Sequence, residues 1–196
     1  MWDERYADPD FAYGTEPNDF LVEQAGLLPQ GPILCLAEGE GRNAVWLAQQ
    51  GHAVTGVDAS AVGLDKARRL AAERGVQIET VCSDLAHFHI EPGAWAGIVS
   101  IFAHVPPALR RDLHRRVVHG LRPGGVLLLE AYTPEQLRYG TGGPPVAEMT
   151  MQIALLEEEL AGLEFVMACE REREIVEGKY HTGAGHVVQL VARKPG

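Results

Sequence analysis

Short runs of apolar residues alternate along the chain with longer stretches whose apolar positions recur at helical spacing. Residues Ile33–Ala37 form a continuous apolar run, which is typical of a strand buried on both faces of a parallel sheet. The stretch Asn43–Gln50 then predicts a helix that ends at Gly51. The same unit recurs, with strands expected at 53–57, 76–81, 97–102 and 126–129, and helices expected between Ser60 and Gly75 and between Pro106 and Gly120. This alternation predicts a doubly wound parallel sheet.

The last third of the chain departs from this alternation. A turn at 121–125 leads into the fifth strand, and the segment Thr133–Pro145 beyond it is rich in Gly, Pro and Tyr, which is typical of a functional loop. A helix is expected at 147–161. Period-two alternation at 163–176 and 187–193 predicts an antiparallel hairpin. We therefore expect a Rossmann-like α/β fold with a doubly wound, mostly parallel seven-stranded sheet that ends in this hairpin.

The length of 196 residues fits a single domain at 1–196, in which 1–28 form an N-terminal cover segment and helix and 29–196 form the sheet core. A formal net charge of −10 disfavours nucleic acid as a partner, because phosphate binding needs the opposite sign. The N-terminus is charged, and no apolar run approaches the roughly 18 residues of a membrane span. Three widely spaced cysteines fit neither a disulfide framework nor a metal site. We expect a cytoplasmic monomer or homodimer with no membrane partner.

A pair of glycines lies between the first predicted strand and the first helix, in the segment Glu38–Ala44 (EGEGRNA). Glycines there let the backbone turn tightly and approach a ligand, while the helix N-terminus offers free N–H groups. Asp58 lies 19 residues after Gly39 and ends the second strand, where a carboxylate binds both hydroxyls of a ribose. The pattern predicts an adenosine-containing cofactor, and it also fits the dinucleotide fingerprint G-x-G-x-x-G/A.

Three features favour S-adenosylmethionine over a nicotinamide dinucleotide. Glu38 and Glu40 flank the loop where a pyrophosphate would lie, and carboxylates repel phosphate but suit an ammonium and a sulfonium. The sequence leaves no length for a second domain, and no tyrosine is followed four residues later by the lysine that one-domain reductases use. Asp84 ends the third strand, where it can accept a hydrogen bond from an adenine amino group.

In their order along the chain, these motifs resemble those of class I S-adenosylmethionine-dependent methyltransferases, in the branch that includes the tellurite-resistance and thiopurine methyltransferase-like proteins. The matching segments are Ile33–Asn43, Val57–Ser60, Ser83–Leu85, Ile101–Pro107 and Leu121–Gly125, and Tyr13–Leu21 resembles the N-terminal cofactor cover of that branch. An acidic residue common before the first glycine in the family is missing here, where the chain has Cys35 and Ala37, and a second common acid is replaced by Ala96. We hypothesise that Glu38 or Glu40 supplies the missing negative charge for the ammonium group.

The resemblance implies S-adenosyl-L-methionine as the cofactor. The glycine loop and the end of the fourth strand would face its methionine part, Asp58 would bind the ribose, and the end of the third strand would hold the adenine. The residues that the resemblance assigns to the cofactor are Glu38, Gly39, Glu40, Gly41, Asp58, Ala59, Asp84, Leu85, Phe102 and Ala103.

The implied reaction is methyl transfer to a small molecule, with a thiol or a chalcogen oxyanion as one acceptor class. His104, after the fourth strand, is the candidate catalytic base, and a structural role is equally open. Arg42 is placed to attract an anionic substrate, and Tyr13 and Tyr139 are candidate substrate contacts. Tyr6, Tyr180 and His181 also fall in segments that cover the binding end of the sheet.

The remaining polar clusters have simpler interpretations. No metal site is predicted, because His87 and His89 lack a third ligand. The charged run 170–174 predicts an exposed, ion-paired strand. Two alternative functions stay open at this point: an NAD(P)-dependent oxidoreductase, and a cofactor-binding protein without turnover.

Overall fold

The computed structural model describes residues 2–196, and its centre is a seven-stranded sheet with the order β3-β2-β1-β4-β5-β7-β6. The first five strands are parallel, whereas β7 runs antiparallel to both β5 and β6. This arrangement confirms the predicted fold class. The strands are β1 (Pro32–Leu36), β2 (Ala53–Asp58), β3 (Glu79–Cys82), β4 (Trp95–Ile101), β5 (Leu121–Tyr132), β6 (Glu164–Glu177) and β7 (His181–Arg193).

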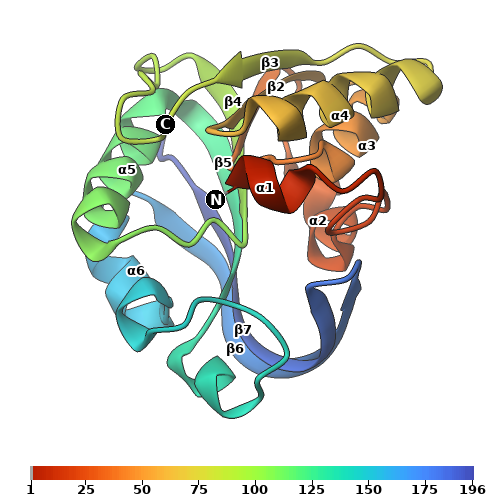
Figure 1. Cartoon of the computed structure of the whole chain (residues 1–196). Coiled ribbons are helices and arrows are strands. Elements are labelled where there is room, and N and C mark those ends of the chain that lie inside the picture. The colour runs from red at the N-terminus through yellow and green to blue at the C-terminus, as the bar shows by residue number, and fades with distance from the viewer. Residues whose placement is uncertain (1) are drawn as a thin grey trace.

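Helices cover both faces of the sheet. On one face lie α2 (Asp19–Gln24), α3 (Arg42–Gln49) and α4 (Ala61–Glu73), and on the other lie α5 (Pro107–Gly120) and α6 (Ile153–Glu159) (Figure 1). Each face has its own apolar core, one around Phe20, Leu21 and Leu47 and the other around Leu113 and Leu156. The short helix α1 (Trp2–Tyr6) and the 3-10 helices η1 (Ala25–Leu27), η2 (Pro134–Arg138) and η3 (Ala147–Met149) complete the chain. Within residues 2–196, the helices are too short or too polar to span a bilayer.

The predicted elements differ from the observed ones mainly at their ends. The helix expected at 147–161 is interrupted, because Met151 donates its backbone N–H to the carbonyl of Tyr132 at 2.9 Å and draws an extended segment onto the end of β5. The predicted turn at 121–125 belongs instead to β5, whose register with β4 shifts between Trp95 and Gly97. The third strand is shorter than predicted and covers only 79–82.

The strand order reverses between β1 and β4, and the backbone is strained where these two strands end. Ala37 follows β1 with a φ of 51°, and Phe102 follows β4 with a φ of 53°. Among residues 2–196, these are the two non-glycine residues with positive φ. Strain of this kind concentrates at functional sites, and the carboxyl ends of strands at such a switch point are where open α/β sheets bind ligands. A ligand site is therefore expected at the ends of β1 and β4.

Candidate active site

The loop between β1 and α3 is shaped by two glycines. Gly39 has a φ of +60° and Gly41 a φ of +91°. A Cβ built on Gly41 would lie 2.6 Å from the Cβ of Ala67 in α4, and one on Gly39 would lie 2.6 Å from the hydroxyl of Tyr6 in α1. The loop is therefore pressed between α4 and the N-terminal segment, and only glycine fits at either position.

Glu38 closes the first turn of α3. Its Oε1 accepts hydrogen bonds from the backbone N–H groups of Asn43, at 3.1 Å, and Ala44, at 2.7 Å. Burial raises the pKa of Glu38 to about 7, although these two bonds and the charge of Arg42 oppose the rise. Glu38 therefore brings a partly buried carboxyl group, held by backbone amides, to the glycine loop.

Glu40 lies in the same loop but is already neutralised. Lys66 of α4 donates from Nζ to its Oε1 at 2.7 Å, and the backbone N–H of Ala12 donates to its Oε2 at 2.8 Å. Lys66 also donates to the carbonyls of Asp8 and Asp10. The side chain of Glu40 thus anchors the N-terminal segment to α4, and of the two glutamates only Glu38 keeps a charge that a cationic ligand can use.

The next carboxylates lie at the ends of β2 and β3. Asp58 accepts from the backbone N–H of Gly39 at 2.9 Å and from that of Ser60 at 2.8 Å, and burial raises its pKa. Asp84 is exposed, and its Oδ1 accepts from the backbone N–H of Ala86 at 2.8 Å. The two strand ends are joined by a bond from the N–H of Ser83 to the carbonyl of Asp58 at 2.9 Å. The glycine loop, Asp58 and Asp84 therefore lie along one edge of the sheet.

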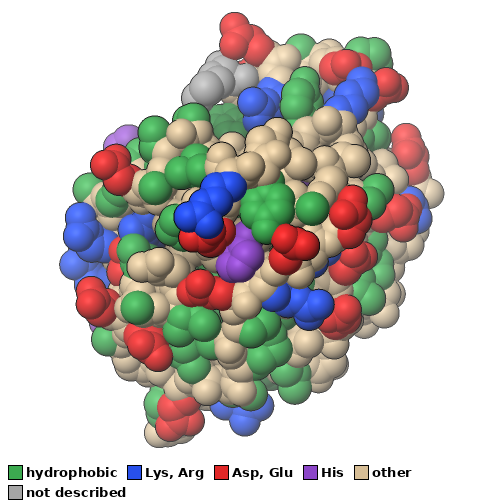
Figure 2. Space-filling model, turned by 90° about the horizontal axis from the view of Figure 1, so that it is seen from below, with side chains coloured by type: hydrophobic (Ala, Val, Ile, Leu, Met, Phe, Trp, Pro, Cys, Tyr) green, Lys and Arg blue, Asp and Glu red, His purple; other side chains and the backbone are tan. Residues whose placement is uncertain are grey.

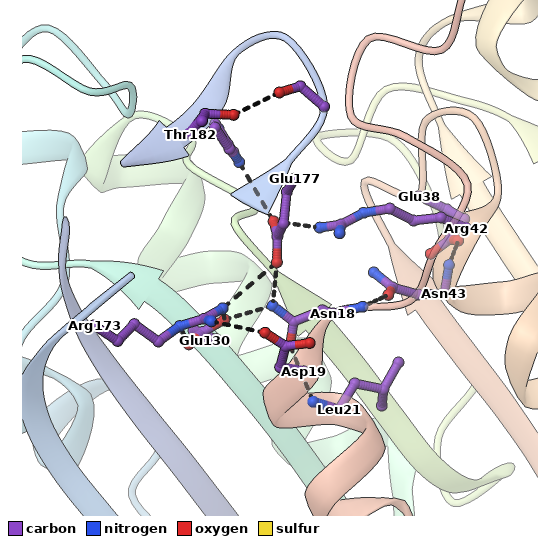
Figure 3. Close-up of polar contacts among 12 residues, drawn as sticks. Asn18, Asp19, Leu21, Glu38, Arg42, Asn43, Glu130, Arg173, Glu177 and Thr182 are labelled. Carbon is purple, nitrogen blue, oxygen red and sulfur yellow. Dashed lines mark hydrogen bonds and ion pairs between the residues drawn. The ribbon is translucent and has the colours of Figure 1, made fainter. Parts of the chain in front are cut away.

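A buried network of ion pairs lies across the loop from these carboxylates. Arg42 donates from Nη2 to Glu177 at 2.7 Å, and Arg173 donates to Glu130 through Nε at 2.9 Å and Nη2 at 3.0 Å. Asn18 joins the two acids, because its Nδ2 donates to Glu130 at 2.6 Å and to Glu177 at 2.8 Å (Figure 3). These contacts connect the N-terminal segment, α3, β5 and β6.

The comparisons with known proteins agree with this arrangement. Residues 33–125 match the family model of a methyltransferase domain. Over these residues, the chain resembles methyltransferases. It is 29% identical over 148 residues to the 2-heptyl-1-hydroxyquinolin-4(1H)-one methyltransferase of Mycobacteroides abscessus, a match that covers 72% of this chain and 64% of that protein.

Further relatives resemble parts of this chain or its fold. The carboxy-S-adenosyl-L-methionine synthase of Pasteurella multocida is 30% identical over 83 residues, which cover 41% of this chain and 34% of the synthase. The crystal structure of TehB from Haemophilus influenzae superposes with a TM-score of 0.74 at 19% identity and covers 98% of this chain and 65% of that one. The chain spans less than two thirds of the length of the curated relatives it matches.

His104 is placed differently from what a catalytic base requires. Its Nδ1–H donates to the carbonyl of Met149 at 2.9 Å, and its Nε2 accepts from the backbone N–H of Tyr132 at 3.2 Å. Burial lowers the pKa of His104 to about 4. Both nitrogens are occupied, so the geometry corrects the prediction of a catalytic base and favours the structural role, in which His104 ties the segment around Met149 to β5.

The predicted substrate residues are divided between the site and the surface. Tyr13 packs on the ring of His181 with centroids 4.6 Å apart, and Arg42 is buried in the network. Tyr139 instead donates to Glu172 on the outer surface of β6, away from both, so the structure does not support it as a substrate contact. Ala103 and Leu85 are buried, whereas Ala59 is exposed beside Asp58.

Four members of the buried network were not predicted from the sequence. Arg173 was expected in an exposed run, but its guanidinium is largely buried against Glu130, which is 0% exposed. Asn18 lies in the segment Tyr13–Leu21 that resembles the cofactor cover but was not singled out within it, and Glu177 gave no sequence signal beyond its charge. A fully buried carboxylate at the end of an apolar strand, as Glu130 is, was the one available hint, because such a group needs a charged partner.

Proposed function

We propose that the chain transfers the methyl group of S-adenosylmethionine to a small molecule. The observation that carries the proposal is the pair Glu38 and Asp58, two carboxyl groups at the glycine loop whose pKa values are raised by burial and which accept from backbone amides. A ligand with an ammonium group, a sulfonium and ribose hydroxyls complements them. A dinucleotide pyrophosphate does not, because it would add negative charge beside them.

The residues present fit this cofactor in a definite order. The backbone of 38–41 would lie against its methionine part, with Phe102 and Ala103 on the other side. Asp58 would bind the ribose, and Ala59, Asp84 and Leu85 would hold the adenine. The bound cofactor supplies an activated methyl group, and the chain supplies alignment and the exclusion of water, in which α1 takes part by covering Gly39 with Tyr6.

A cluster of aromatic rings lies beside the loop assigned to the cofactor, and we call this region the acceptor side. These rings favour a small planar acceptor that carries a hydroxyl group. The rings of Phe102 and Tyr132 lie 4.6 Å apart, and His181 packs against both. The relative from Mycobacteroides abscessus is named for a hydroxyquinolone. A thiol or a chalcogen oxyanion is the second candidate, because a soft nucleophile needs little more than alignment. Acidic and basic side chains are interspersed on the face shown in Figure 2, which gives no support to nucleic acid as a substrate.

Calorimetry and transfer assays test the proposal in two steps. S-adenosylhomocysteine should bind and NADH should not. Methyl-labelled S-adenosylmethionine should then label at least one member of a panel of hydroxyquinolones, phenols, thiols, selenite and tellurite. Binding of NADH but not of S-adenosylhomocysteine would indicate an oxidoreductase instead. Binding of S-adenosylhomocysteine without any methyl transfer would favour a cofactor-binding protein without turnover. The same samples, run on a sizing column, report whether the protein is a monomer or a homodimer.

A further inference from the structure

We propose that His181 accepts the proton of a hydroxyl acceptor and that Glu177 orients its imidazole. The proposal deepens the methyl transfer proposed above and rests on it. His181 is the first residue of β7 and follows a short turn after Glu177, the last residue of β6. The hairpin thus brings an imidazole and a carboxylate to the same end of the sheet as the glycine loop.

The two groups face each other without a direct hydrogen bond. Nδ1 of His181 lies 3.7 Å from Oε2 of Glu177, a distance that suits charge attraction but is too long for a hydrogen bond. The same Nδ1 is buried and has no hydrogen-bond partner among residues 2–196. Buried polar atoms are almost always satisfied, and Glu177 is the acid beside this one, so Nε2 is the ring nitrogen left for a ligand.

The imidazole is walled by aromatic rings. The centroid of its ring lies 4.6 Å from that of Tyr13, 4.9 Å from that of Phe102 and 5.4 Å from that of Tyr132. Phe102 follows β4 at the point where the strand order reverses, next to the loop assigned to the cofactor. A planar acceptor that contacts these rings would therefore meet His181 edge-on, within reach of a proton.

The charges around the ring determine its tautomer. Glu177 is held as an anion, because its contacts with His181, Arg42 and Asn18 outweigh burial and lower its pKa to about 2. A fixed negative charge beside Nδ1 favours the proton on that nitrogen and leaves the lone pair on Nε2. The charged or titratable groups that face His181 from the surrounding elements are Glu177, Arg42, Tyr13, Tyr132, Tyr180 and His104.

Arg42 offers a second unpartnered donor at the same place. Its Nη2 is bound to Glu177, whereas its Nη1 is buried and has no partner among the described residues. Only 10% of the Arg42 side chain is exposed. The free N–H of Arg42 is therefore suited to bind the negative charge that develops on an acceptor oxygen as it loses its proton.

The resulting step is balanced. The O–H proton of the acceptor passes to Nε2 of His181, and the oxygen lone pair forms the new bond to the methyl carbon. The sulfur–methyl bond breaks with its electron pair left on sulfur. The imidazolium, paired with Glu177, then returns its proton to water. A base so placed contributes roughly 10²- to 10⁴-fold to the rate.

The test compares His181→Gln with His119→Gln, in which an exposed histidine at the end of α5 is changed instead. With a phenol acceptor, the single-turnover rate of the wild type and of His119→Gln should rise as the pH rises from 5 to 8. His181→Gln should be at least 100-fold slower and lose this rise, while it binds S-adenosylhomocysteine as the wild type does. Equal rates and pH profiles in the two variants would overturn the proposal and leave the proposed function standing. Failure of the wild type to transfer any methyl group would overturn both.

Two measurements do not depend on turnover. Without cofactor at pH 6, the wild type should increase the yellow phenolate absorption of 4-nitrophenol, and His181→Gln should not. In the wild type, the nitrogen chemical shifts of the His181 imidazole should place the proton on Nδ1, a result that stands even if the variant fails to fold. A proton on Nε2, or a phenolate signal that is unchanged in His181→Gln, would overturn the assignment.

Discussion

The two sides of the glycine loop are built in different ways. On the cofactor side, the contacts come from backbone geometry and from residues close in sequence, such as Glu38 with Asn43 and Asp58 with Gly39. On the acceptor side, side chains from distant segments meet, and Asn18 and Glu177 bond to each other across 159 positions of sequence. The family match at 33–125 includes the residues of the cofactor side. Of the buried ion-pair network, it includes only Arg42.

Because of this difference, we expect the cofactor side to determine cofactor binding and the acceptor side to determine the stability of the fold. The carboxyl groups of the cofactor side can still bind a ligand. Substitution of these carboxyl groups should therefore weaken cofactor binding and leave the fold intact. The acceptor side is held by buried charges that satisfy one another, and removal of one leaves its partner without compensation in a low-dielectric interior. We therefore expect the acceptor side to fail first by unfolding.

Glu130→Ala should show the largest effect. The carboxylate of Glu130 is 0% exposed and accepts from Arg173, Asn18 and Gln189, so its loss leaves the largely buried guanidinium of Arg173 with only the longer contacts to Asp19 and Glu177. We expect the free energy of unfolding, measured with urea, to fall by about 3–5 kcal/mol. Asp65→Ala is the control, because it removes an ion pair whose two side chains are 51% and 66% exposed, and we expect a loss of about 0–1 kcal/mol. Similar losses in both variants would contradict the distinction.

Substitution of two glycines with the same φ distinguishes the cost of backbone strain from the cost of crowding on the cofactor side. Gly41 and Gly51 both have a φ of +91°, but a Cβ on Gly51 meets nothing within 4 Å, whereas one on Gly41 lies 2.7 Å from the Cα of Ala67. We expect Gly51→Ala to cost about 1 kcal/mol and Gly41→Ala about 3 kcal/mol, since overpacking against backbone adds to the strain. Gly41→Ala should also lose S-adenosylhomocysteine binding, while Gly51→Ala keeps it. Equal stability and binding in the two variants would show that the packing against α4 does not shape the loop.

His104→Ala probes the contact that ties the segment around Met149 to β5. It leaves the carbonyl of Met149 and the N–H of Tyr132 unpaired, for an expected loss of about 2 kcal/mol at pH 7. The folded pKa of about 4 lies below the ordinary value of 6.5, so the unfolded chain takes up this proton first, and wild-type stability falls as the pH drops from 6.5 to 4. The part of this acid dependence that His104 causes should vanish in the variant, when urea unfolding is repeated from pH 4 to 7. An unchanged acid slope would mean that His104 is accessible to protons in the folded state.

Glu38→Gln should weaken cofactor binding without a comparable change in stability. The pKa of about 7 predicts that a cationic ligand binds better as the pH rises from 6 to 8, because the carboxylate is the form that attracts it. We expect S-adenosylmethionine to bind roughly tenfold more weakly to the variant at pH 8, which corresponds to about 1.4 kcal/mol, and the difference to shrink at pH 6. Glu40→Gln removes a carboxylate that Lys66 already pairs and keeps Glu38, so it should bind with the pH dependence of the wild type in calorimetry. If both variants bind as the wild type does, the missing charge is not supplied by the loop.

The limits of sequence analysis follow the same division. Ile33–Ala37, the glycine pair and Asp58 were predictable because strand burial, turn geometry and helix N-termini act over short distances in sequence. Arg173 was expected to be exposed, since an alternating charged strand shows which residues share a face but not what lies against that face. His104 shows the same limit, because its partners, Met149 and Tyr132, lie in segments that only the folded chain brings together.

The smallest expected effects come from substitutions of two tyrosines, Tyr13 and Tyr139. Tyr13 accepts a hydrogen bond from Arg5 and packs on His181, whereas Tyr139 donates to Glu172 on the outer surface of β6. Tyr139→Phe should leave the free energy of unfolding and the transfer rate close to those of the wild type, since Glu172 can replace this exposed bond with one to water. Tyr13→Leu, which removes a ring beside the imidazole, should raise KM for a planar acceptor in the transfer assay and leave S-adenosylhomocysteine binding unchanged. A rise in KM for Tyr139→Phe alone would instead place the acceptor on the outer face of the hairpin, where Glu172 and not Glu177 is the neighbouring acid.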